Sequence, residues 1–247
     1  HVGAHMTTNN HDDYEGYQSF KSWAPDSFGH TNMEQKIYFD REFELIQVGG
    51  LTNKVIVEIG FGNGSFWSWT NDQGNRYYGF ELIPELVKTA QSRGVNAFDA
   101  NSAVDEVVPA ETVDYVIAWD VFEHLTNDEI HLKLTECHKV LKSGGKLIAR
   151  VPSGDSPFSG PLQNGDQTHK TSIGSSMVIQ FAKKANFYVD TIRSPVFPLT
   201  GLGFKTFSRR LLVIICRGVF YPFISKAFMG AGNPVLTQNM IFILQKP

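Results

Sequence analysis

Three glycines at alternate positions, Gly60, Gly62 and Gly64, follow an apolar run that ends in Glu58. Glycine lets a ligand approach the backbone closely, because no side chain covers it, and it tolerates the positive φ of a tight turn. A carboxylate just before such a turn can receive a cation or orient the loop. A tight turn between a strand and a helix needs only one glycine, so three of them favour a ligand-binding turn over a purely structural one.

A second group of side chains, Asp120, Glu123 and His124, has the spacing i, i+3 and i+4. If a helical turn begins there, Asp120 and His124 share one face with Glu123 beside them, so all three converge. Carboxylate oxygens with one or two imidazoles suit Mg²⁺, Mn²⁺ or a softer transition ion, and a histidine can also act as a general base near neutral pH. His169, in the polar loop "NGDQTHKT", is a further base or fourth ligand. The alternative is that Glu123 and His124 only cap the next helix.

The elements that must position these groups alternate between strands and helices. Short, nearly continuous apolar runs predict parallel strands, covered on both faces, at 55–59, 77–80, 95–98, 113–119 and 146–151. Helical patterns follow at 84–93, 128–141 and 175–186, with later strands at 188–193 and 239–244. This order predicts an α/β fold, a doubly wound, mostly parallel, seven-stranded Rossmann-like sheet with a helical and apolar insertion before the last strand. Ligands of such a sheet bind beyond the carboxyl ends of its strands, where the glycines fall.

The glycine turn separates two cofactor classes. A dinucleotide fingerprint would need glycine or alanine at position 65, where this chain has Ser65, so a nicotinamide oxidoreductase is the weaker alternative. The spacing Glu58-Ile-Gly60-Phe-Gly62-Asn-Gly64 instead resembles the first motif of the class I S-adenosylmethionine-dependent methyltransferases. The segments "YYGFELIPE", "FDANS", "IAWDVFEHL" and "LKSGGKLIARVPS" are similar to the family's later motifs, in the same order. The resemblance covers roughly residues 40–151 and concerns the fold and the cofactor rather than the acceptor.

The resemblance implies that the chain is an enzyme with S-adenosylmethionine as its cofactor. It implies that Glu81, at the tip of the second strand, binds both ribose hydroxyls, and that Asp99, at the end of the third, binds the adenine amino group. A solvated acid at a helix start is the alternative for Glu81. The full set of expected cofactor-binding residues is Glu58, Gly60, Gly62, Asn63, Gly64, Glu81, Leu82, Asp99, Ala100 and Asp120. A non-catalytic module that binds the cofactor is a further alternative.

The family's reaction is an in-line displacement at the sulfonium methyl, so the protein aligns the nucleophile, excludes water and removes a proton from a hydroxyl acceptor. The expected catalytic residues are His124, His169 and Asp120. An acid, acid, histidine cluster similar to the one here occurs in ubiquinone-type O-methyltransferases, where it implies a divalent cation that binds the acceptor oxygens. The metal-binding set expected on that basis is Asp120, Glu123, His124 and His169.

The acceptor has to be inferred from the second half of the chain. The segment 165–187, "GDQTHKTSIGSSMVIQFAKKANF", resembles methyltransferases encoded with bacterial polysaccharide synthesis. That resemblance implies O-methylation of a sugar hydroxyl in a glycan or glycolipid, and a quinone or another small molecule is the alternative acceptor. The aromatic residues Tyr14, Tyr17, Phe20 and Trp23 can form a lid over a sugar or the cofactor, or a short helix packed on the core.

Composition limits the remaining function classes. With 247 residues, of which 42% are hydrophobic, the chain can bury one full core, and its net charge of -3 gives no support for a nucleic-acid partner. Two cysteines without metal-binding spacing favour a reducing, cytoplasmic compartment over a disulfide framework or a structural zinc site. We expect residues 1–5 to be an expression scar, 6–40 an N-terminal lid segment and 41–247 the methyltransferase domain. Acceptor-side insertions are expected at about 152–174 and 196–232.

The apolar segment 205–228 raises the question of a membrane. Its longest apolar run, Leu211 to Cys216, is far below the roughly 20 residues that span a bilayer, and Arg217 and Pro222 interrupt it. We therefore expect no transmembrane helix. Basic residues nearby would suit a helix that rests on anionic lipid at the inner face of the membrane: Lys205, Arg209, Arg210 and Lys226. A dimer contact and a buried lid over the acceptor are the alternatives, and the oligomeric state is left open.

Overall fold

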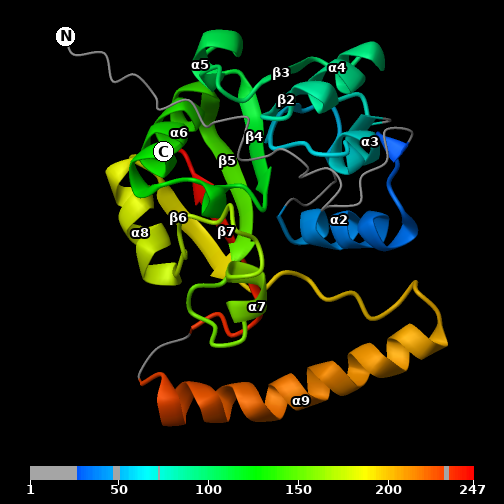
Figure 1. Cartoon of the computed structure of the whole chain (residues 1–247), viewed down its shortest axis with the longest axis vertical. Helices are drawn as coiled ribbons and strands as arrows, with labels where there is room; N and C mark the ends of the chain where they lie inside the picture. Colours follow the sequence, from blue (N-terminus) through cyan, green and yellow to red (C-terminus); the bar gives the residue numbers. More distant parts are fainter. Residues whose placement is uncertain (1–26, 47–50, 72, 231–233) are drawn as a thin grey trace.

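The computed structural model describes residues 27–46, 51–71, 73–230 and 234–247, and the N-terminal aromatic residues considered as a lid lie outside them. The strands are β1 (Val55–Ile59), β2 (Arg76–Glu81), β3 (Ala97–Asp99), β4 (Val113–Trp119), β5 (Leu141–Pro152), β6 (Tyr188–Arg193) and β7 (Asn239–Gln245) (Figure 1). The helices are α2 (Met33–Ile46), α3 (Ser65–Asn71), α4 (Pro84–Ser92), α5 (Val104–Val107), α6 (Asn127–Val140), α7 (Gly160–Gln163), α8 (Ser175–Lys184) and α9 (Phe204–Phe228), with a 3₁₀ turn η3 (Phe122–His124). The expected strands and helices are confirmed, with ends that differ by a few residues.

One seven-stranded sheet, in the order β3-β2-β1-β4-β5-β7-β6, organises the described part of the chain. Strands β1 to β5 are mutually parallel, while β7 runs antiparallel to both β5 and β6. The expected doubly wound, mostly parallel, Rossmann-like fold is therefore confirmed. Parallel strands need crossover connections, and the helices between β1 and β5 supply them.

Two apolar layers sandwich the sheet. Successive residues of a strand point to opposite faces, and in β1 Ile56 joins one buried cluster while Val57 joins the other. Helices α2, α3 and α4 cover the first face through residues such as Phe39 and Phe66. Helices α5, α6 and α8 cover the second face, with Leu134 among the fully buried side chains. Each large apolar side chain buried in this way contributes roughly 1.5–3 kcal/mol.

The register of the strands brings their carboxyl ends to one edge of the sheet. Ile59 pairs with Phe80 of β2 and Ala118 of β4, and Glu81 pairs with Asp99 of β3. Residues that follow β1, β2, β3 and β4 in the sequence therefore come together at this edge, where ligands of doubly wound sheets bind.

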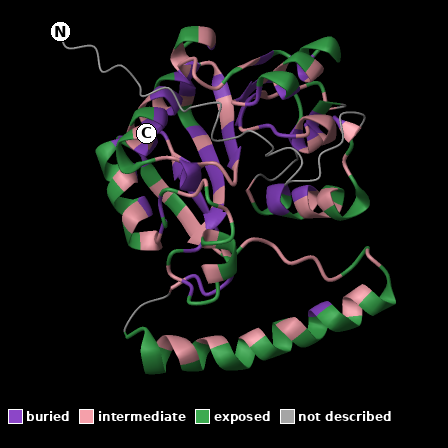
Figure 2. Ribbon diagram, viewed as in Figure 1, coloured by how far each residue is buried: buried purple, intermediate pink, exposed green. Residues whose placement is uncertain are grey.

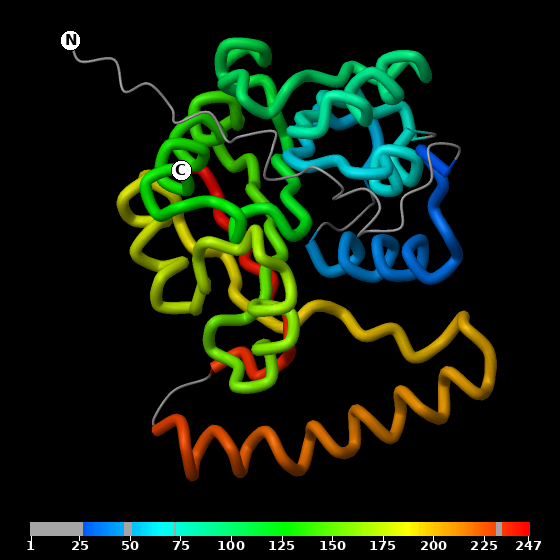
Figure 3. Tube along the Cα trace, viewed as in Figure 1, coloured from blue at the N-terminus to red at the C-terminus, as the bar shows by residue number. Residues whose placement is uncertain are grey.

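The acceptor side contains the expected helical and apolar insertion, but its helix is longer than the sequence pattern predicted. From β6 an extended stretch, residues 194–203, leads to the far end of α9, which then runs back toward β7 (Figure 3). Arg217 and Pro222 do not interrupt this helix, which continues for 25 residues. Most of it is exposed (Figure 2).

Helix α9 also meets a length and composition test for crossing a membrane, with a mean hydropathy of 1.6 over its most apolar 18 residues. The expectation that interruptions make this segment too short is thus wrong. Apolar residues on both sides of Arg217 make the helix apolar as a whole, although no unbroken apolar run within it is long. One such helix is weak support for a membrane span.

Candidate functional site

The glycine turn after β1 has a backbone conformation that favours glycine. Gly60, Gly62 and Gly64 have φ values of 71°, 53° and 72°. An added Cβ would lie 2.6 Å from Val121 at Gly60 and 2.7 Å from Phe28 at Gly64, so the surrounding side chains leave no room for one. Gly60 and Gly64 therefore need glycine whether or not a ligand binds, so three glycines do not by themselves distinguish a ligand-binding turn from a structural one.

A cavity of about 340 Å³ nevertheless opens beside this turn at the carboxyl edge of the sheet. Its walls come from the glycine turn, the end of β2 and the segments that follow β3 and β4, including Gly60, Gly62, Glu81, Asn101, Asp120 and His124. Four further expected cofactor residues also line it: Glu58, Asn63, Leu82 and Ala100. Gly64 and Asp99 do not.

Glu81 ties the glycine turn to the end of β2. Its Oε2 accepts a hydrogen bond of 2.9 Å from the Gly62 N–H, and its Oε1 accepts bonds from the Leu82 N–H at 2.7 Å and the Ile83 N–H at 3.1 Å. Burial raises the pKa of this carboxyl, and the three N–H groups partly oppose that shift. An ionised carboxylate has about four acceptor positions, so about one is left for a ligand.

Glu58 borders the cavity and also contacts the neighbouring strand β2. The Tyr77 hydroxyl donates a 2.5 Å hydrogen bond to Glu58 Oε2, and both side chains are buried. Burial raises the pKa of the Glu58 carboxyl well above its ordinary value, and the Tyr77 hydrogen bond opposes the shift. The carboxylate therefore has a structural partner, as an acid that orients the loop would.

Asp99 is exposed at the end of β3, and its Oδ1 accepts a 2.8 Å hydrogen bond from the Asn101 N–H. The next two residues, Ala100 and Asn101, line the cavity in its place. In this conformation the Asp99 carboxylate does not border the cavity, and Asn101 is the polar side chain at this wall. Asn101 could have been proposed from the sequence, because it is a polar residue within "FDANS".

Asp120 lies directly after β4 in the left-handed region, with φ of 56°. Arg150, from β5, donates from its Nε to Asp120 Oδ1 at 2.9 Å and pairs through Nη2 with Oδ2. The guanidinium also lies over the rings of Tyr38 and Trp119, at 5.5 and 5.6 Å. The sequence analysis did not propose Arg150 as a site residue. Its position as a charged residue at the end of the apolar run "KLIAR" could have indicated it.

A buried ion pair on α6 also borders the cavity. Lys133 Nζ lies 2.7 Å from Glu136 Oε2, and the side chains are 11% and 9% exposed. Glu136 Oε2 also accepts a 3.2 Å hydrogen bond from the Val104 N–H, which joins α6 to the start of α5. The charges of Lys133 and Glu136 therefore balance each other, and the sequence pattern assigned this pair no function.

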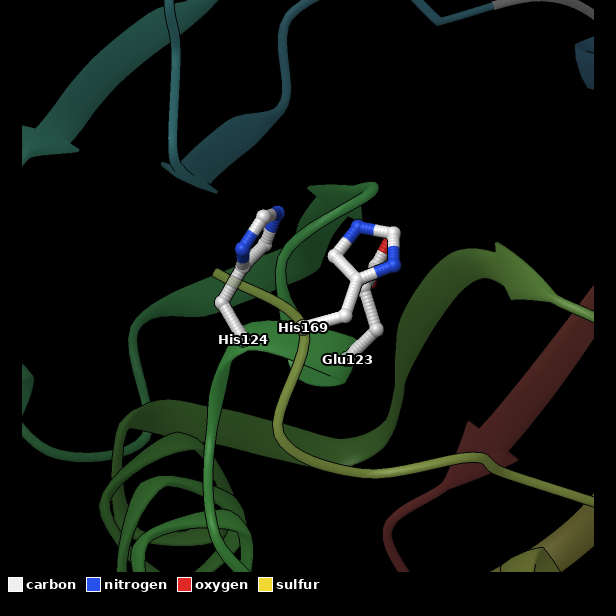
Figure 4. A group of neighbouring side chains, drawn as sticks. All are labelled: Glu123, His124 and His169. Atoms are coloured by element: carbon white, nitrogen blue, oxygen red, sulfur yellow. The ribbon is translucent and has the colours of Figure 1, made fainter. Parts of the chain in front are cut away.

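Glu123, His124 and His169 gather at the end of η3, with one potential ligand atom from each within 4.8 Å of the others. Glu123 and His124 rise from the turn, and His169 reaches them from the loop after β5 (Figure 4). The two imidazole rings meet edge to face, with centroids 4.7 Å apart. Asp120, expected as the first acid of this set, is instead engaged with Arg150, because η3 is a single 3₁₀ turn that starts after it.

Backbone hydrogen bonds fasten the loop of His169 to η3. The N–H groups of Lys170 and Thr171 both donate to the Glu123 carbonyl, at 2.8 and 3.0 Å. The Thr171 hydroxyl donates to the Leu125 carbonyl at 2.6 Å. His169 Nδ1 lies 3.0 Å from the Gln163 carbonyl, so it carries the proton and leaves Nε2 with the lone pair.

The tautomer of His124 follows from its neighbours. The Thr168 hydroxyl donates its single proton to Asp166 Oδ1 at 2.5 Å, so it can only accept from His124 Nδ1, which lies 2.9 Å away. Nδ1 therefore carries a proton, and the neutral ring has its lone pair on Nε2. His124 also lines the cavity, so its imidazole borders the space beside the glycine turn.

Comparison with known proteins agrees with this geometry. The family described as "Methyltransferase domain" matches residues 57–149. An uncharacterized methyltransferase from Geobacillus sp. (strain WCH70) is 25% identical over 137 residues, which cover 52% of this chain and 63% of the relative.

Solved structures share the fold at low identity. A SAM-dependent methyltransferase from Archaeoglobus fulgidus matches with a TM-score of 0.62 and 16% identity, over 94% of this chain and 99% of that one. A phosphoethanolamine N-methyltransferase from Haemonchus contortus, in complex with S-adenosyl-L-methionine, matches with a TM-score of 0.54 and 17% identity, over 87% and 52% of the two chains.

The region matched by the family spans β1 to β5 and contains the glycine turn, Glu81 and His124. This chain covers less than two thirds of the length of the curated relative, so the match concerns the domain rather than a whole protein. Residues 57–149 are thus similar to methyltransferase domains, and the solved structures share the fold of this chain.

Proposed function

We propose that this chain is an S-adenosylmethionine-dependent O-methyltransferase that methylates a hydroxyl of a sugar in a bacterial glycan or glycolipid. The observation that carries the proposal is the single cavity where the glycine turn, the Glu81 carboxylate and the basic face of His124 meet. The first two groups suit a cofactor, and the third suits removal of a proton from an acceptor.

In this proposal the donor lies along the cavity, with its ribose at Glu81. Three backbone N–H groups already occupy this carboxylate, so one ribose hydroxyl can be accepted directly. Binding the second requires the loss of one of those bonds, most simply that from Gly62. The adenine then lies beside Ala100 and Asn101, and the Asp99 carboxylate reaches it only by releasing the Asn101 N–H.

Methyl transfer requires no covalent enzyme intermediate. The acceptor oxygen attacks the methyl carbon in line with the departing sulfur, so a C–O bond forms as the C–S bond breaks and the electron pair stays on sulfur. The hydroxyl proton passes to His124 Nε2, and Asp166 acting through Thr168 supports the resulting imidazolium. His169 and the Asp120–Arg150 pair border this region, where they can orient the acceptor.

A divalent cation is the specific alternative for proton removal. Glu123, His124 and His169 offer a carboxylate and two imidazoles, a donor set that transition ions accept, and the His169 Nδ1 bond to a carbonyl is the usual support for a ligating ring. Metal–ligand bonds of about 2.1 Å place the ligand atoms about 3.4 Å from one another. The ligand atoms of Glu123, His124 and His169 lie within 4.8 Å of one another, so binding an ion would draw these side chains closer together. When bound, the ion would lower the pKa of the acceptor hydroxyl.

The acceptor is the least constrained part of the proposal. The likeness of residues 165–187 to methyltransferases of polysaccharide synthesis favours a sugar, and a cytoplasmic site near the membrane would suit a lipid-linked glycan. A fold neighbour that is an N-methyltransferase illustrates that the fold does not select oxygen. Quinones and other small molecules, and a module that binds the cofactor without transferring a methyl group, are the competing functions.

The test is a methylation assay with the methyl group of the donor isotopically labelled. Candidate lipid-linked glycans, free glycans and quinols are offered in parallel, and the products are identified by mass. Label in a glycan supports the proposal, and label only in quinols selects the alternative acceptor. Donor binding by calorimetry without transfer to any of them would indicate a binding module, whereas a thermal shift with a nicotinamide cofactor alone would contradict the class of cofactor.

A further inference from the structure

Helix α9 presents an apolar stripe to the outside of the molecule. Leu212, Ile215, Val219 and Phe223 follow one another at helical spacings of three, four and four residues, so they share one face. Their side chains are 61%, 56%, 64% and 62% exposed. Four adjacent apolar side chains this exposed are unusual on a water-facing helix and mark an interaction surface. We call these four residues the outer stripe.

The opposite face of α9 is held by the protein. Arg210 is buried, donates to the Pro198 carbonyl at 2.6 Å and pairs with Glu34 of α2. Arg217 lies over the ring of Phe197, 4.9 Å from its centroid. Tyr221 stacks on Phe158 of the loop after β5, with centroids 6.2 Å apart. The helix therefore lies across one end of the protein (Figure 1), and these contacts are all on the face opposite the outer stripe.

This arrangement argues against a helix that crosses a membrane. A spanning helix would carry Arg210 and its partner Glu34 into or across the hydrocarbon, where charged groups cost several kcal/mol each. A helix lying flat leaves both on the protein side and places only the outer stripe in an apolar environment.

The charges around the outer stripe identify its partner. Helix α9 contains no acidic residue, and the exposed Lys205 and Arg209 precede the stripe while Lys226 follows it. A two-fold contact between copies of this chain would set one basic helix against another. An anionic membrane surface matches both properties, because its headgroups pair with the cations and its acyl boundary accepts the stripe.

We propose that α9 lies flat in the interface of an anionic lipid membrane and binds it through the outer stripe and the flanking cations. Membrane binding does not depend on the proposed methyl transfer. Where both hold, α9 links the membrane to the proposed site. It pairs with Glu34, whose neighbour Gln35 lines the cavity, and it contacts Phe158 in the loop that also carries His169. The acceptor side would then face the bilayer, as a lipid-linked acceptor requires.

Flotation with lipid vesicles tests binding without using activity. The protein is expected to float with vesicles of phosphatidylcholine and phosphatidylglycerol, and to do so much less with phosphatidylcholine alone or at high salt. Val219→Asp should lower the partition coefficient by about tenfold or more, whereas Ile179→Asp, on an equally exposed apolar residue of α8, should not change it. Replacing Lys205, Arg209 or Lys226 by Gln should lower it by about fivefold each. Absence of flotation overturns the proposal.

Cys216, at the middle of α9, distinguishes the orientations, because the other cysteine, Cys137, is buried. A polarity-sensitive fluorophore on Cys216 should shift to the blue with anionic vesicles and be quenched by shallow rather than deep lipid quenchers. Labels at Lys205→Cys and Lys226→Cys, each in a Cys216→Ser background, should report the same depth. A deep Cys216 between shallow ends would indicate a span, and a blue shift that depends on protein concentration without vesicles would indicate a dimer. Either result overturns the proposal, and donor binding measured on the same samples tests the proposed function separately.

Discussion

The cofactor half of the molecule, residues 54–151, and the acceptor side, residues 152–230, hold their polar groups in different ways. In the cofactor half, carboxylates bond to nearby backbone: Glu81 accepts from the two N–H groups that follow it, and Asp99 from that of Asn101. On the acceptor side, ion pairs join distant segments, as Arg193 does with Glu42 and Arg210 with Glu34. The carboxylates at the ends of β2 and β3 are thus held mainly by adjacent backbone, whereas long-range ion pairs join the acceptor side to α2.

His124 lies where the two halves meet, so changing it should produce the largest effect. It belongs to the cofactor half, yet its tautomer is set by Thr168 of the acceptor side. His124→Gln should lower turnover at saturating donor by about 10²- to 10⁴-fold, the usual contribution of a general base, with little change in donor affinity by calorimetry. Near-normal turnover would mean that alignment alone carries the reaction.

Two matched variants sharpen this result. Thr168→Val removes the acceptor of the Nδ1 proton but leaves the imidazole, so turnover should fall by only about tenfold. His169→Gln should have a small effect if His124 is a metal-free base. If a cation binds Glu123, His124 and His169, both histidine variants should be equally impaired, and chelation should abolish activity.

The second prediction concerns how the acceptor side is fastened to α2. Arg193 Nη2 lies 2.5 Å from Glu42 Oε2, and the Glu42 side chain is fully buried. Arg193→Ala leaves that carboxylate buried without its cation, so the free energy of unfolding should fall by about 3 kcal/mol or more. The control is Lys146→Ala, which breaks a more exposed pair with Asp190 and should cost about 0–1 kcal/mol. Equal losses in urea unfolding would contradict the contrast.

The same contrast explains what the sequence could predict. Runs such as 55–59 and 113–119 specify strands through local composition, and their observed bounds agree with the prediction. Gly60, Glu81 and Asn63 were recognisable because their spacing is short and tied to one turn. The contacts of Arg150 and of the Glu42–Arg193 pair depend on which helices and strands become neighbours in the fold. No local sequence pattern contains that information. The length of α9 was predicted wrongly from its longest unbroken apolar run. The hydropathy averaged over the helix is a better guide to its length.

The third prediction tests the cofactor half through Glu81. Glu81→Ala removes its direct bond to a donor ribose, which at roughly 1.5–3 kcal/mol for a charge-assisted hydrogen bond corresponds to a rise in the donor Kd of about 10- to 150-fold. It also releases Gly62, Leu82 and Ile83, so a modest loss of stability should accompany it. Glu85→Ala, in the exposed first turn of α4, should change neither quantity. Unchanged donor affinity in calorimetry would remove Glu81 from the site.

The last effect is a pH dependence that originates in the cofactor half. Burial raises the pKa of Glu58 well above 4.5 in the folded chain, so Glu58 stabilises the fold fully at pH below 4.5. As pH rises, the unfolded chain loses this proton first, and stability falls by at most about 1.4 kcal/mol per pH unit until the folded-state pKa is passed.

Glu58→Gln removes this proton while its amide oxygen can still accept from the Tyr77 hydroxyl. The variant should therefore gain stability relative to the parent chain as pH rises from about 5 to about 8, measured by urea unfolding at each pH. Glu81, whose pKa is also raised by burial, is present in both proteins, so most of its contribution cancels in the difference. Parallel stability curves would show that Glu58 stays ionised in the folded chain, in which case its carboxylate is available to hold the positive charge of a bound donor after all.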